Sequence, residues 1–500
     1  MSTRDFDAIV LGAGPAGEVC AGRLAENGLS VALVERELVG GECSFYACMP
    51  SKALLRPAQA LAEARRVVGA AEAAGGAIDV AAVLRRRDEI VHDLTDDAQL
   101  PWLEKRGIAL VRGHGMVVGE REVRVGEDLL RARKAVILAP GTGAAIPPIP
   151  GLRESQPWTN REVTTAKAIP SSLLVLGGGA VGVEMAAAYA SLGAQVTIVE
   201  ALPRLIANEE EFASEQVREA LVKEGVEIVL GVKATAARRR PAEREQGAPS
   251  TRDPGSEPRA EDADAEREND ARVAHKNSKK DALGKVTLEL ENGLSVTGEE
   301  LLVAIGRRPH TDALGLESLG LEPGKPVEVD DTMRVPGHEW LYVVGDANGR
   351  ALLTHMGKYQ ARLAADHILG KVGEISVLRS DGRLSPRVIF TEPQVAAVGH
   401  TLRSAQDAGL NVRAVDTPTE GSAGGSFVGH DAPGTAWIVV DEDRRVIVGA
   451  TFTGVEVAES LHAATIAVIG EVPIERLWHA VPCFPTRSEL WLNLLEAYGL

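Results

Sequence analysis

The same short pattern occurs twice in this chain, and it restricts the possible fold more than any other feature. In the first copy a strand expected at residues 7–11 leads into Gly12, Gly14 and Gly17, and the next strand ends at Glu35. The first glycine permits a tight turn, the second lets a pyrophosphate approach the backbone, and the third lets the helix pack on the strand. The glutamate would accept hydrogen bonds from a ribose. This pattern predicts an α/β unit that binds a dinucleotide.

The second copy begins with a strand expected at residues 172–176 and continues through Gly177, Gly179 and Gly182 into an alanine-rich helix. Its second strand ends at Glu200. Two complete copies predict two bound nucleotides, most simply one flavin and one nicotinamide.

Glu200 also bears on the choice of nicotinamide cofactor. A carboxylate at this position hydrogen-bonds the ribose diol and repels a 2′-phosphate, so it favours NADH over NADPH. Arg204 follows four residues later and would partly offset this repulsion. The sequence therefore predicts a preference for NADH.

Cys43 and Cys48 stand five residues apart, directly after the first nucleotide unit. A thiolate near the N-terminus of a helix expected around Pro50 would be stabilised by free N–H groups and the helix dipole. The pair is a candidate redox disulfide. The alternatives are two packed thiols or half of a metal site, but zinc needs four clustered ligands and Cys20 and Cys483 are distant in sequence.

Composition and charge argue against several classes of protein. Of the 500 residues 45% are hydrophobic, as in a soluble globular chain, and no apolar run approaches the ~20 residues of a membrane span. The net charge of −17 disfavours a nucleic-acid partner because nothing compensates for phosphate repulsion. The N-terminus has no hydrophobic signal core, and four cysteines without one indicate a reducing compartment. We expect a cytoplasmic protein without a metal, membrane or nucleic-acid partner.

The composition changes abruptly between about residues 237 and 283. This stretch is rich in Glu, Asp, Arg, Pro, Gly and Ser and has almost no apolar residue. Such a segment cannot bury enough surface to offset its chain entropy, so we expect it to be disordered. It is either a tolerated surface insertion or a loop that docks a partner. A hairpin with an Asn292-Gly293 turn is expected to follow.

Taken together, the chain resembles the class I pyridine nucleotide–disulfide oxidoreductases, which include dihydrolipoyl dehydrogenase, glutathione reductase, mercuric reductase and the soluble transhydrogenase. The resemblance covers nearly the whole chain apart from the charged insertion. Besides the two nucleotide patterns, it rests on Cys43-x4-Cys48 with Pro50-Ser51-Lys52, Glu184, the run Ala304 to Pro309, Gly345-Asp346, the run Phe390 to Pro393, and Val398-Gly399.

The resemblance implies an α/β fold with two Rossmann-like dinucleotide-binding domains, one for FAD and one for NAD, and a C-terminal α+β dimerisation domain. The expected FAD domain has two parts, 1–150 and 311–384, on either side of an NAD domain at 151–310. The dimerisation domain is expected at 385–500. The resemblance also implies a homodimer in which the C-terminal domain of one subunit completes the active site of the other.

The family's functional residues carry over onto matching positions. For FAD these are Gly12, Gly14, Gly17, Glu35, Lys52, Gly115, Asp346 and Thr354, and for NAD they are Gly177, Gly179, Gly182, Glu200, Val232 and Gly306. The implied catalytic residues are Cys43, Cys48, Lys52, Glu184 and Glu489. Lys52 would approach the flavin N5 edge and pair with Glu184. Cys48 would face the flavin, and Cys43 would exchange with a small-molecule disulfide or another electron acceptor.

Two departures from the family pattern bear on activity. Disulfide reductases of the family carry a His near the C-terminus as acid–base for the exchanging thiol, and Phe484 occupies that position here, ahead of Glu489. Because general acid–base catalysis contributes ~10²–10⁴-fold, dihydrolipoamide turnover should be heavily impaired. Glu42 stands where relatives usually have Thr. It either disfavours a thiolate at Cys43 or points outward.

Three further residues have both a functional and a plainer interpretation. Cys483 is either a third thiol for a relay or a metal, or a small apolar filler. His479 is either a substitute base or a residue of the preceding turn, away from the sulfurs. His355 is expected to support the flavin site rather than catalysis.

The sequence thus predicts an FAD-containing, NADH-linked oxidoreductase with a redox-active Cys43–Cys48 disulfide, similar to dihydrolipoyl dehydrogenase. The rival enzyme is a reductase of metal ions or quinones, although the terminal cysteine pair expected of mercuric reductase does not precede Leu500. The non-enzymatic rival is a flavoprotein that acts as a sensor or interaction subunit.

Overall fold

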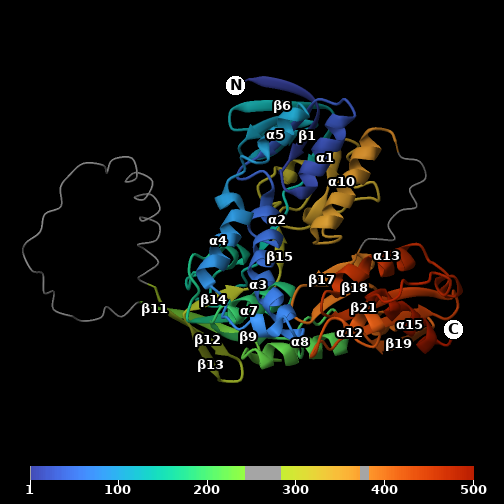
Figure 1. Cartoon of the computed structure of the whole chain (residues 1–500). Helices are drawn as coiled ribbons and strands as arrows, with labels where there is room; N and C mark the ends of the chain where they lie inside the picture. Colours follow the sequence, from blue (N-terminus) through green and yellow to red (C-terminus); the bar gives the residue numbers. More distant parts are fainter. Residues whose placement is uncertain (1, 242–282, 372–381) are drawn as a thin grey trace, which may run out of the picture.

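The structure, a computed structural model, describes residues 2–241, 283–371 and 382–500. The two nucleotide units and the C-terminal region each build on sheets of their own (Figure 1). The predicted fold class is therefore confirmed, while the domain boundaries given above stay a prediction. No helix in these described ranges is long and apolar enough to cross a membrane.

The largest sheet belongs to the first nucleotide unit. Its strands are β1 (Thr3–Leu11), β2 (Val31–Glu35), β3 (Ala109–Arg112), β4 (Gly115–Gly119), β5 (Glu122–Val125), β6 (Asp128–Leu138) and β16 (Leu341–Val343). The spatial order is β3-β2-β1-β6-β5-β4, with β16 beside β6. Strands β1, β2 and β6 are parallel, so their carboxyl ends meet at one edge, where doubly wound folds bind ligands.

The helices of this unit lie in the same stretches of the chain as these strands. They are α1 (Pro15–Glu26), α2 (Gly41–Phe45), α3 (Cys48–Arg66), α4 (Val80–Ile90), α5 (Leu100–Lys105) and α10 (Thr354–Ile368), with short 3-10 turns η1 (Ala71–Ala73), η2 (His92–Leu94), η3 (Leu316–Leu319) and η4 (Gly345–Asn348). Figure 1 shows α10 beside α1, although they are far apart in the sequence. An ion pair between Arg23 and Asp366, with an N–O distance of 2.6 Å, joins them. The late segment thus completes the first unit.

The second nucleotide unit has a parallel sheet of its own, in the order β10-β9-β8-β14. Its elements are β8 (Ser172–Leu176), β9 (Gln195–Glu200), β10 (Glu227–Leu230), β14 (Glu300–Val303), α6 (Asn160–Thr165), α7 (Ala180–Ser191) and α8 (Glu211–Lys223). A two-stranded ladder of β7 (Thr142–Ala144) with β15 (Arg307–Pro309) leads back to the first unit. Buried residues of α3 and α7, including Leu54 and Val183, share one core. This packing brings helices of both nucleotide units together.

The edges of the charged segment differ from the prediction. Residues 237–241 and 283, expected to be disordered, belong to β11 (Ala234–Pro241) and β12 (Leu283–Leu290), which pair antiparallel and continue into β13 (Ser295–Gly298). Arg239 explains part of this order because its guanidinium pairs with Glu300 at 2.6 Å and donates to the Ser155 carbonyl at 2.7 Å. The remainder of the segment lies outside the described residues. Gly293 has a φ of 83°, as the predicted hairpin turn requires.

The C-terminal region is a five-stranded antiparallel sheet, as far as it is described, in the order β17-β18-β21-β20-β19. Its elements are β17 (Arg387–Ile389), β18 (Gln394–Gly399), β19 (Val412–Pro418), β20 (Thr435–Asp441), β21 (Val446–Gly454), α11 (Leu402–Asp407), α12 (Ala423–Ser426), α13 (Leu461–Ile469), α14 (Ile474–Leu477), α15 (Leu490–Tyr498), η5 (Gly382–Leu384), η6 (Val457–Ser460) and η7 (Arg487–Glu489). The core between this sheet and helices α13 and α15 includes Phe452 and Leu494. Arg387 docks the sheet on the second unit through Glu209, with N–O distances of 2.6 and 2.8 Å.

Candidate active site

The first glycine turn has the geometry that a pyrophosphate site needs. Gly12 has a φ of 103°, and a Cβ there would lie 2.2 Å from the Ala139 carbonyl oxygen. A Cβ on Gly17 would lie 1.9 Å from the Gly12 carbonyl oxygen, so only glycine lets α1 approach β1. A Cβ on Gly14 would meet no described atom within 4 Å. The N-terminus of α1 therefore faces open space, which fits a bound phosphate group.

Glu35 stands at the carboxyl end of β2, as predicted. Its Oε2 accepts a hydrogen bond from the Ala13 N–H, and its Oε1 accepts one from the Glu37 N–H, both at 2.7 Å. The carboxylate is thus fixed beside the glycine turn and retains acceptor capacity for ribose hydroxyls.

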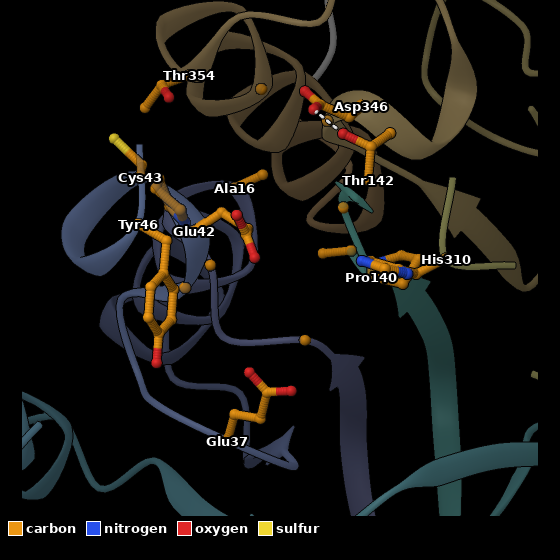
Figure 2. A pocket seen from close by; sticks show the side chains of 18 of the residues that line it. Ala16, Glu37, Glu42, Cys43, Tyr46, Pro140, Thr142, His310, Asp346 and Thr354 are labelled. Carbon is orange, nitrogen blue, oxygen red and sulfur yellow. Dashed lines mark hydrogen bonds between the residues drawn. The ribbon is translucent and has the colours of Figure 1, made fainter. Parts of the chain in front are cut away.

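A pocket with about 890 Å³ of empty space, partly open to solvent, extends from this turn. Gly12, Gly14 and Glu35 line it together with Cys43 and Thr354. Figure 2 shows Glu37 at one end and Cys43 with Thr354 at the other. An elongated ligand bound at the glycine turn would therefore reach Cys43.

Asp346 also lines the pocket, as predicted, and it is held by two residues that sequence reasoning did not assign. Its Oδ2 accepts from the Thr142 hydroxyl at 2.6 Å (Figure 2). Arg307 Nε donates to the same hydroxyl at 2.6 Å, and its guanidinium lies 3.8 Å from Asp346. Arg307 belongs to a motif already singled out, but Thr142 has no local signal because its partners lie more than 150 residues away.

Five residues expected at the flavin site do not line this pocket: Gly17, Cys48, Lys52, Gly115 and His355. A Cβ on Gly115 in β4 would contact the side chains of Leu11 and Val34 at 3.1 Å, so this glycine packs on the sheet. His355 Nε2 lies 2.8 Å from the Pro386 carbonyl oxygen, and the ring supports the junction with the C-terminal region instead of the pocket.

The two cysteines lie on consecutive helices. Cys43 is on α2, and α3 begins at Cys48, two residues before the expected start near Pro50. Both are free thiols in the structure. The prediction of a helix N-terminus near the pair is therefore correct, and Cys48 is closer to that terminus than expected. No group of three or more His, Cys, Asp or Glu residues in the described ranges could hold a metal ion, so the pair has no metal-site partners there.

The local environment makes the two thiols unequal. The mutual hydrogen bond raises the pKa of Cys43, with burial as the second cause. The same bond lowers the pKa of Cys48, against the effect of burial. Thr354 Oγ1, 3.5 Å from Cys48 Sγ, and the charge of Lys52 act in the same direction. The negative charge of a singly ionised pair therefore resides on Cys48.

Lys52 and Glu184 meet across the contact between α3 and α7, as predicted. Lys52 Nζ donates to Glu184 Oε2 at 2.7 Å. Glu184 Oε1 accepts from the Phe390 N–H at 2.9 Å, and the Phe390 ring lies 4.6 Å from Lys52 Nζ. Sequence reasoning placed Phe390 in a motif but gave it no role in the site.

Glu42 fits neither of its two expected interpretations. Its Oε1 accepts from Arg161 Nε and its Oε2 from Asn160 Nδ2, both at 2.6 Å. Arg161 also stacks on Tyr46, 4.4 Å from the ring centroid. Glu42 is thus bound to the N-terminal turn of α6, and the adjacent guanidinium opposes the expected charge effect of the carboxylate on Cys43.

The second glycine turn repeats the geometry of the first. Gly177 has a φ of 112°, and a Cβ there would lie 2.5 Å from the Ala304 carbonyl oxygen. A Cβ on Gly182 would lie 2.0 Å from the Gly177 carbonyl oxygen, whereas one on Gly179 would meet no described atom within 4 Å. The turn is a second site that fits a dinucleotide pyrophosphate.

Glu200 is fixed beside this turn, since its Oε2 accepts from the Gly178 N–H at 2.5 Å. Arg204 points elsewhere and donates to the Ala207 and Glu209 carbonyls at 2.7 and 2.8 Å. The expected offset of the Glu200 charge by Arg204 is therefore weakened. Val232 is bound to the backbone at the end of the same strand, because its N–H donates to the Glu200 carbonyl at 3.2 Å.

Gly306 comes directly before β15 and has a φ of 149°. A Cβ there would meet no described atom within 4 Å, and the backbone is open to a ligand.

The C-terminal candidates lie apart from the pocket of their own chain. The Phe484 side chain is 77% exposed, and Glu489 Oε2 accepts from the Gly424 N–H at 3.2 Å. Cys483 and His479 are exposed as well, so Cys483 is not a filler in the core of its own chain. These residues do not join the cysteine pair within one subunit.

Comparison with known proteins identifies the class. Residues 6–361 match the sequence model of the pyridine nucleotide-disulphide oxidoreductases, and residues 385–494 match the dimerisation domain of that family. The chain belongs to the pyridine nucleotide-disulphide oxidoreductase family. It is thus an FAD-dependent oxidoreductase, and members of the family bind FAD and NAD(H). The two glycine turns and their glutamates fit these two cofactors.

Several relatives span almost the whole chain. Dihydrolipoyl dehydrogenase of Zymomonas mobilis is 30% identical over 508 aligned positions, which cover 99% of this chain and 98% of the relative. Mercuric reductase of Staphylococcus aureus is 27% identical over 491 positions, 97% of this chain and 81% of the relative. The flavoprotein disulfide reductase RclA from Escherichia coli, solved as a Cu(II) complex, has a TM-score of 0.78 at 23% identity and 99% coverage of both chains. LpdA from Mycobacterium tuberculosis has a TM-score of 0.79 at 21% identity and full coverage of both chains. These structures support the fold alone.

Proposed function

We propose that this protein is an NADH-linked reductase whose Cys43–Cys48 pair delivers electrons to a small acceptor. Bound FAD would supply the chemistry of accepting two electrons from NADH and passing them to the disulfide. The observation that carries this proposal is the unequal cysteine pair, in which Cys43 lines the pocket, the pKa of Cys48 is lowered and that of Cys43 is raised.

Each residue of the proposed site has a separate task. Lys52, paired with Glu184, places a cation beside Cys48 and favours its thiolate. We assign exchange with the acceptor to Cys43, whose pKa is raised, and the thiolate to Cys48, although it is Cys43 and not Cys48 that lines the pocket. Glu35 and Glu200 orient the two nucleotides through their ribose hydroxyls, and the fixed carboxylate of Glu200 disfavours a 2′-phosphate.

The acceptor is the least constrained part of the proposal. A disulfide such as lipoamide leaves two thiolates that need protons, and Phe484 supplies none. This position favours, as a second candidate function, a metal ion, which needs no proton, or a quinone, whose reduced oxygens can take their protons from water. We further propose a homodimer that brings Glu489 to the partner's cysteine pair, and a cytoplasmic location in which the pair can cycle between thiol and disulfide.

Anaerobic titration of the FAD-loaded protein with NADH tests this function. We expect bleaching of the flavin, then a long-wavelength charge-transfer band and two new thiols per subunit. Oxidation of NADH is then followed with lipoamide, low-molecular-weight disulfides, quinones and Hg(II) as acceptors. Reduction of the flavin without any change in thiol count would contradict the role of the cysteines, and a non-enzymatic sensor would show turnover with none of the acceptors.

A further inference from the structure

Phe390, which follows β17, contacts both members of the Lys52–Glu184 pair. Its ring centroid lies 4.6 Å from Lys52 Nζ, and its backbone N–H donates to Glu184 Oε1 at 2.9 Å. The other carboxylate oxygen, Oε2, accepts from Lys52 Nζ at 2.7 Å. One residue of the C-terminal region thus contacts the lysine through its ring and the glutamate through its backbone.

Phe390 is itself held in place from α3. Gln59 Nε2 donates to the Phe390 carbonyl at 2.9 Å, and the ring packs against the core that α3 and α7 share. Lys52 and Gln59 both lie on α3, so this helix presents the ammonium to the ring and fixes the ring's backbone at the same time. The stacking of Lys52 on Phe390 therefore belongs to a packed contact between α3, α7 and the segment after β17.

The lysine needs such a contact because one ion pair does not fix it. The Lys52 side chain is 35% exposed, compared with 7% for Glu184. An ammonium on a flexible four-carbon stem has many rotamers and a strong affinity for water. An aromatic face within about 6 Å attracts a cation and limits this freedom.

We propose that Phe390 is a positioning residue, whose ring holds the Lys52 ammonium beside Glu184 and Cys48. The importance of this positioning for electron transfer rests on the proposed function. The effect of the ammonium on Cys48 can be measured without turnover. The charged groups that act on Cys48 are Lys52, Glu184 and the coupled thiol Cys43. A displaced ammonium would leave the Cys48 thiolate less stabilised.

The test uses the full chain without added cofactor, in a Cys43→Ser background that leaves Cys48 as the one thiol of the pair. The rate of Cys48 alkylation by iodoacetamide, mapped by mass spectrometry, is measured as a function of pH. Phe390→Leu keeps the backbone N–H and an apolar side chain but removes the ring. We expect it to lower the alkylation rate about threefold at a pH below the Cys48 pKa, because the pKa rises. Phe390→Tyr should retain the original rate.

A double-mutant cycle separates positioning from packing. In a Lys52→Met background, Phe390→Leu should change the rate no further, because the ammonium is absent. An equal effect with and without Lys52 would overturn the proposal. Phe212→Leu is the matched control. Phe212 packs on Trp437 at another contact of the C-terminal region, with ring centroids 5.4 Å apart. This variant should leave the alkylation rate unchanged.

Two outcomes keep the test decisive. If circular dichroism shows that Phe390→Leu does not fold, Phe390→Met takes its place, and a Met variant with the original alkylation profile would also overturn the proposal. A failure of NADH to reduce the cysteine pair would remove the proposed function but would not alter these alkylation rates. The two failures are therefore distinguishable.

Discussion

At the scale of single residues, the contacts of the cysteine pair predict the pH range in which Cys48 is a thiolate. The pKa of Cys48 is lowered by its hydrogen bond with Cys43, so its thiolate, in the reduced pair, persists to a lower pH than an ordinary thiol with a pKa of about 8.5. In the FAD-loaded Cys43→Ser variant, a hydroxyl replaces that partner and can donate to the thiolate in its place, so the charge-transfer band should survive and still titrate below the pH of an ordinary thiol. In Cys48→Ser the band should be absent at every pH. Spectra recorded during a pH titration check both outcomes, and identical behaviour of the two variants would contradict the assignment.

Glu200 gives a second prediction at this scale. Its carboxylate is bound to the Gly178 N–H, whereas the Arg204 guanidinium is occupied by backbone carbonyls. Glu200→Ala should therefore raise the KM for NADH about tenfold, by loss of a charge-assisted hydrogen bond, and improve kcat/KM for NADPH. Steady-state kinetics with both cofactors measures the change. Equal or better kcat/KM for NADPH in the wild type would contradict the NADH preference.

At the scale of elements, alanine substitutions of two glycines in the second turn should have different effects. A Cβ on Gly182 would press α7 away from the Gly177 carbonyl, only 2.0 Å away. Gly182→Ala should lower stability by about 1–3 kcal/mol, as for other overpacked sites, and weaken NADH binding by moving α7. Chemical denaturation and binding titration measure the two effects.

Gly179→Ala is the matched variant for that experiment. Its Cβ would meet no described atom within 4 Å, and its φ of −76° suits any residue, so folding should be unchanged. The added methyl would instead occupy the space expected for the pyrophosphate and raise the Kd for NADH about tenfold or more. A Gly179→Ala protein with normal NADH affinity would show that the nucleotide does not approach this turn.

The sequence predicts elements well where a pattern is local. Both glycine turns, both terminal glutamates and the hairpin at Gly293 follow from short-range backbone rules and have the predicted geometry. Helix α3 begins at Cys48, two residues before the expected position, and the extension of β11 to Pro241 was missed, because tertiary packing and strand pairing decide where such elements begin and end.

The candidate site shows the same limit. Cys43, Cys48, Lys52 and Glu184 could be placed from motifs of the family. The Arg161 partner of Glu42 lies 119 residues away in the sequence, and Phe390 is 206 residues from Glu184. Contacts at this separation depend on how whole units pack, and no local pattern specifies them.

At the scale of the whole molecule, three regions meet at one point. Lys52 comes from the first nucleotide unit, Glu184 from the second, and Phe390 from the C-terminal region. If Phe390 positions Lys52 as proposed, a change in how the C-terminal region docks would alter the position of the cation beside Cys48. The same region, which matches the dimerisation domain of the family, presents Phe484 with 77% of its side chain exposed.

The last prediction concerns this exposed position. Phe484 cannot exchange a proton, and the carboxylate of Glu489, five residues later, accepts a hydrogen bond from the Gly424 N–H. Phe484→His should raise lipoamide turnover by about tenfold or more, because an imidazole can protonate the leaving thiolate of the partner's substrate. Flavin reduction by NADH should not change, since it does not use this residue.

Stopped-flow measurement of the two half-reactions separates these steps. Phe484→His combined with Glu489→Gln is the matched control and should lose most of the gain, because the imidazole then lacks its carboxylate partner. A dimer-dependent gain would also appear as a loss of activity on dilution below the dimer dissociation constant. Wild-type lipoamide turnover as fast as flavin reduction, without any gain in Phe484→His, would mean that another group such as His479 supplies the proton.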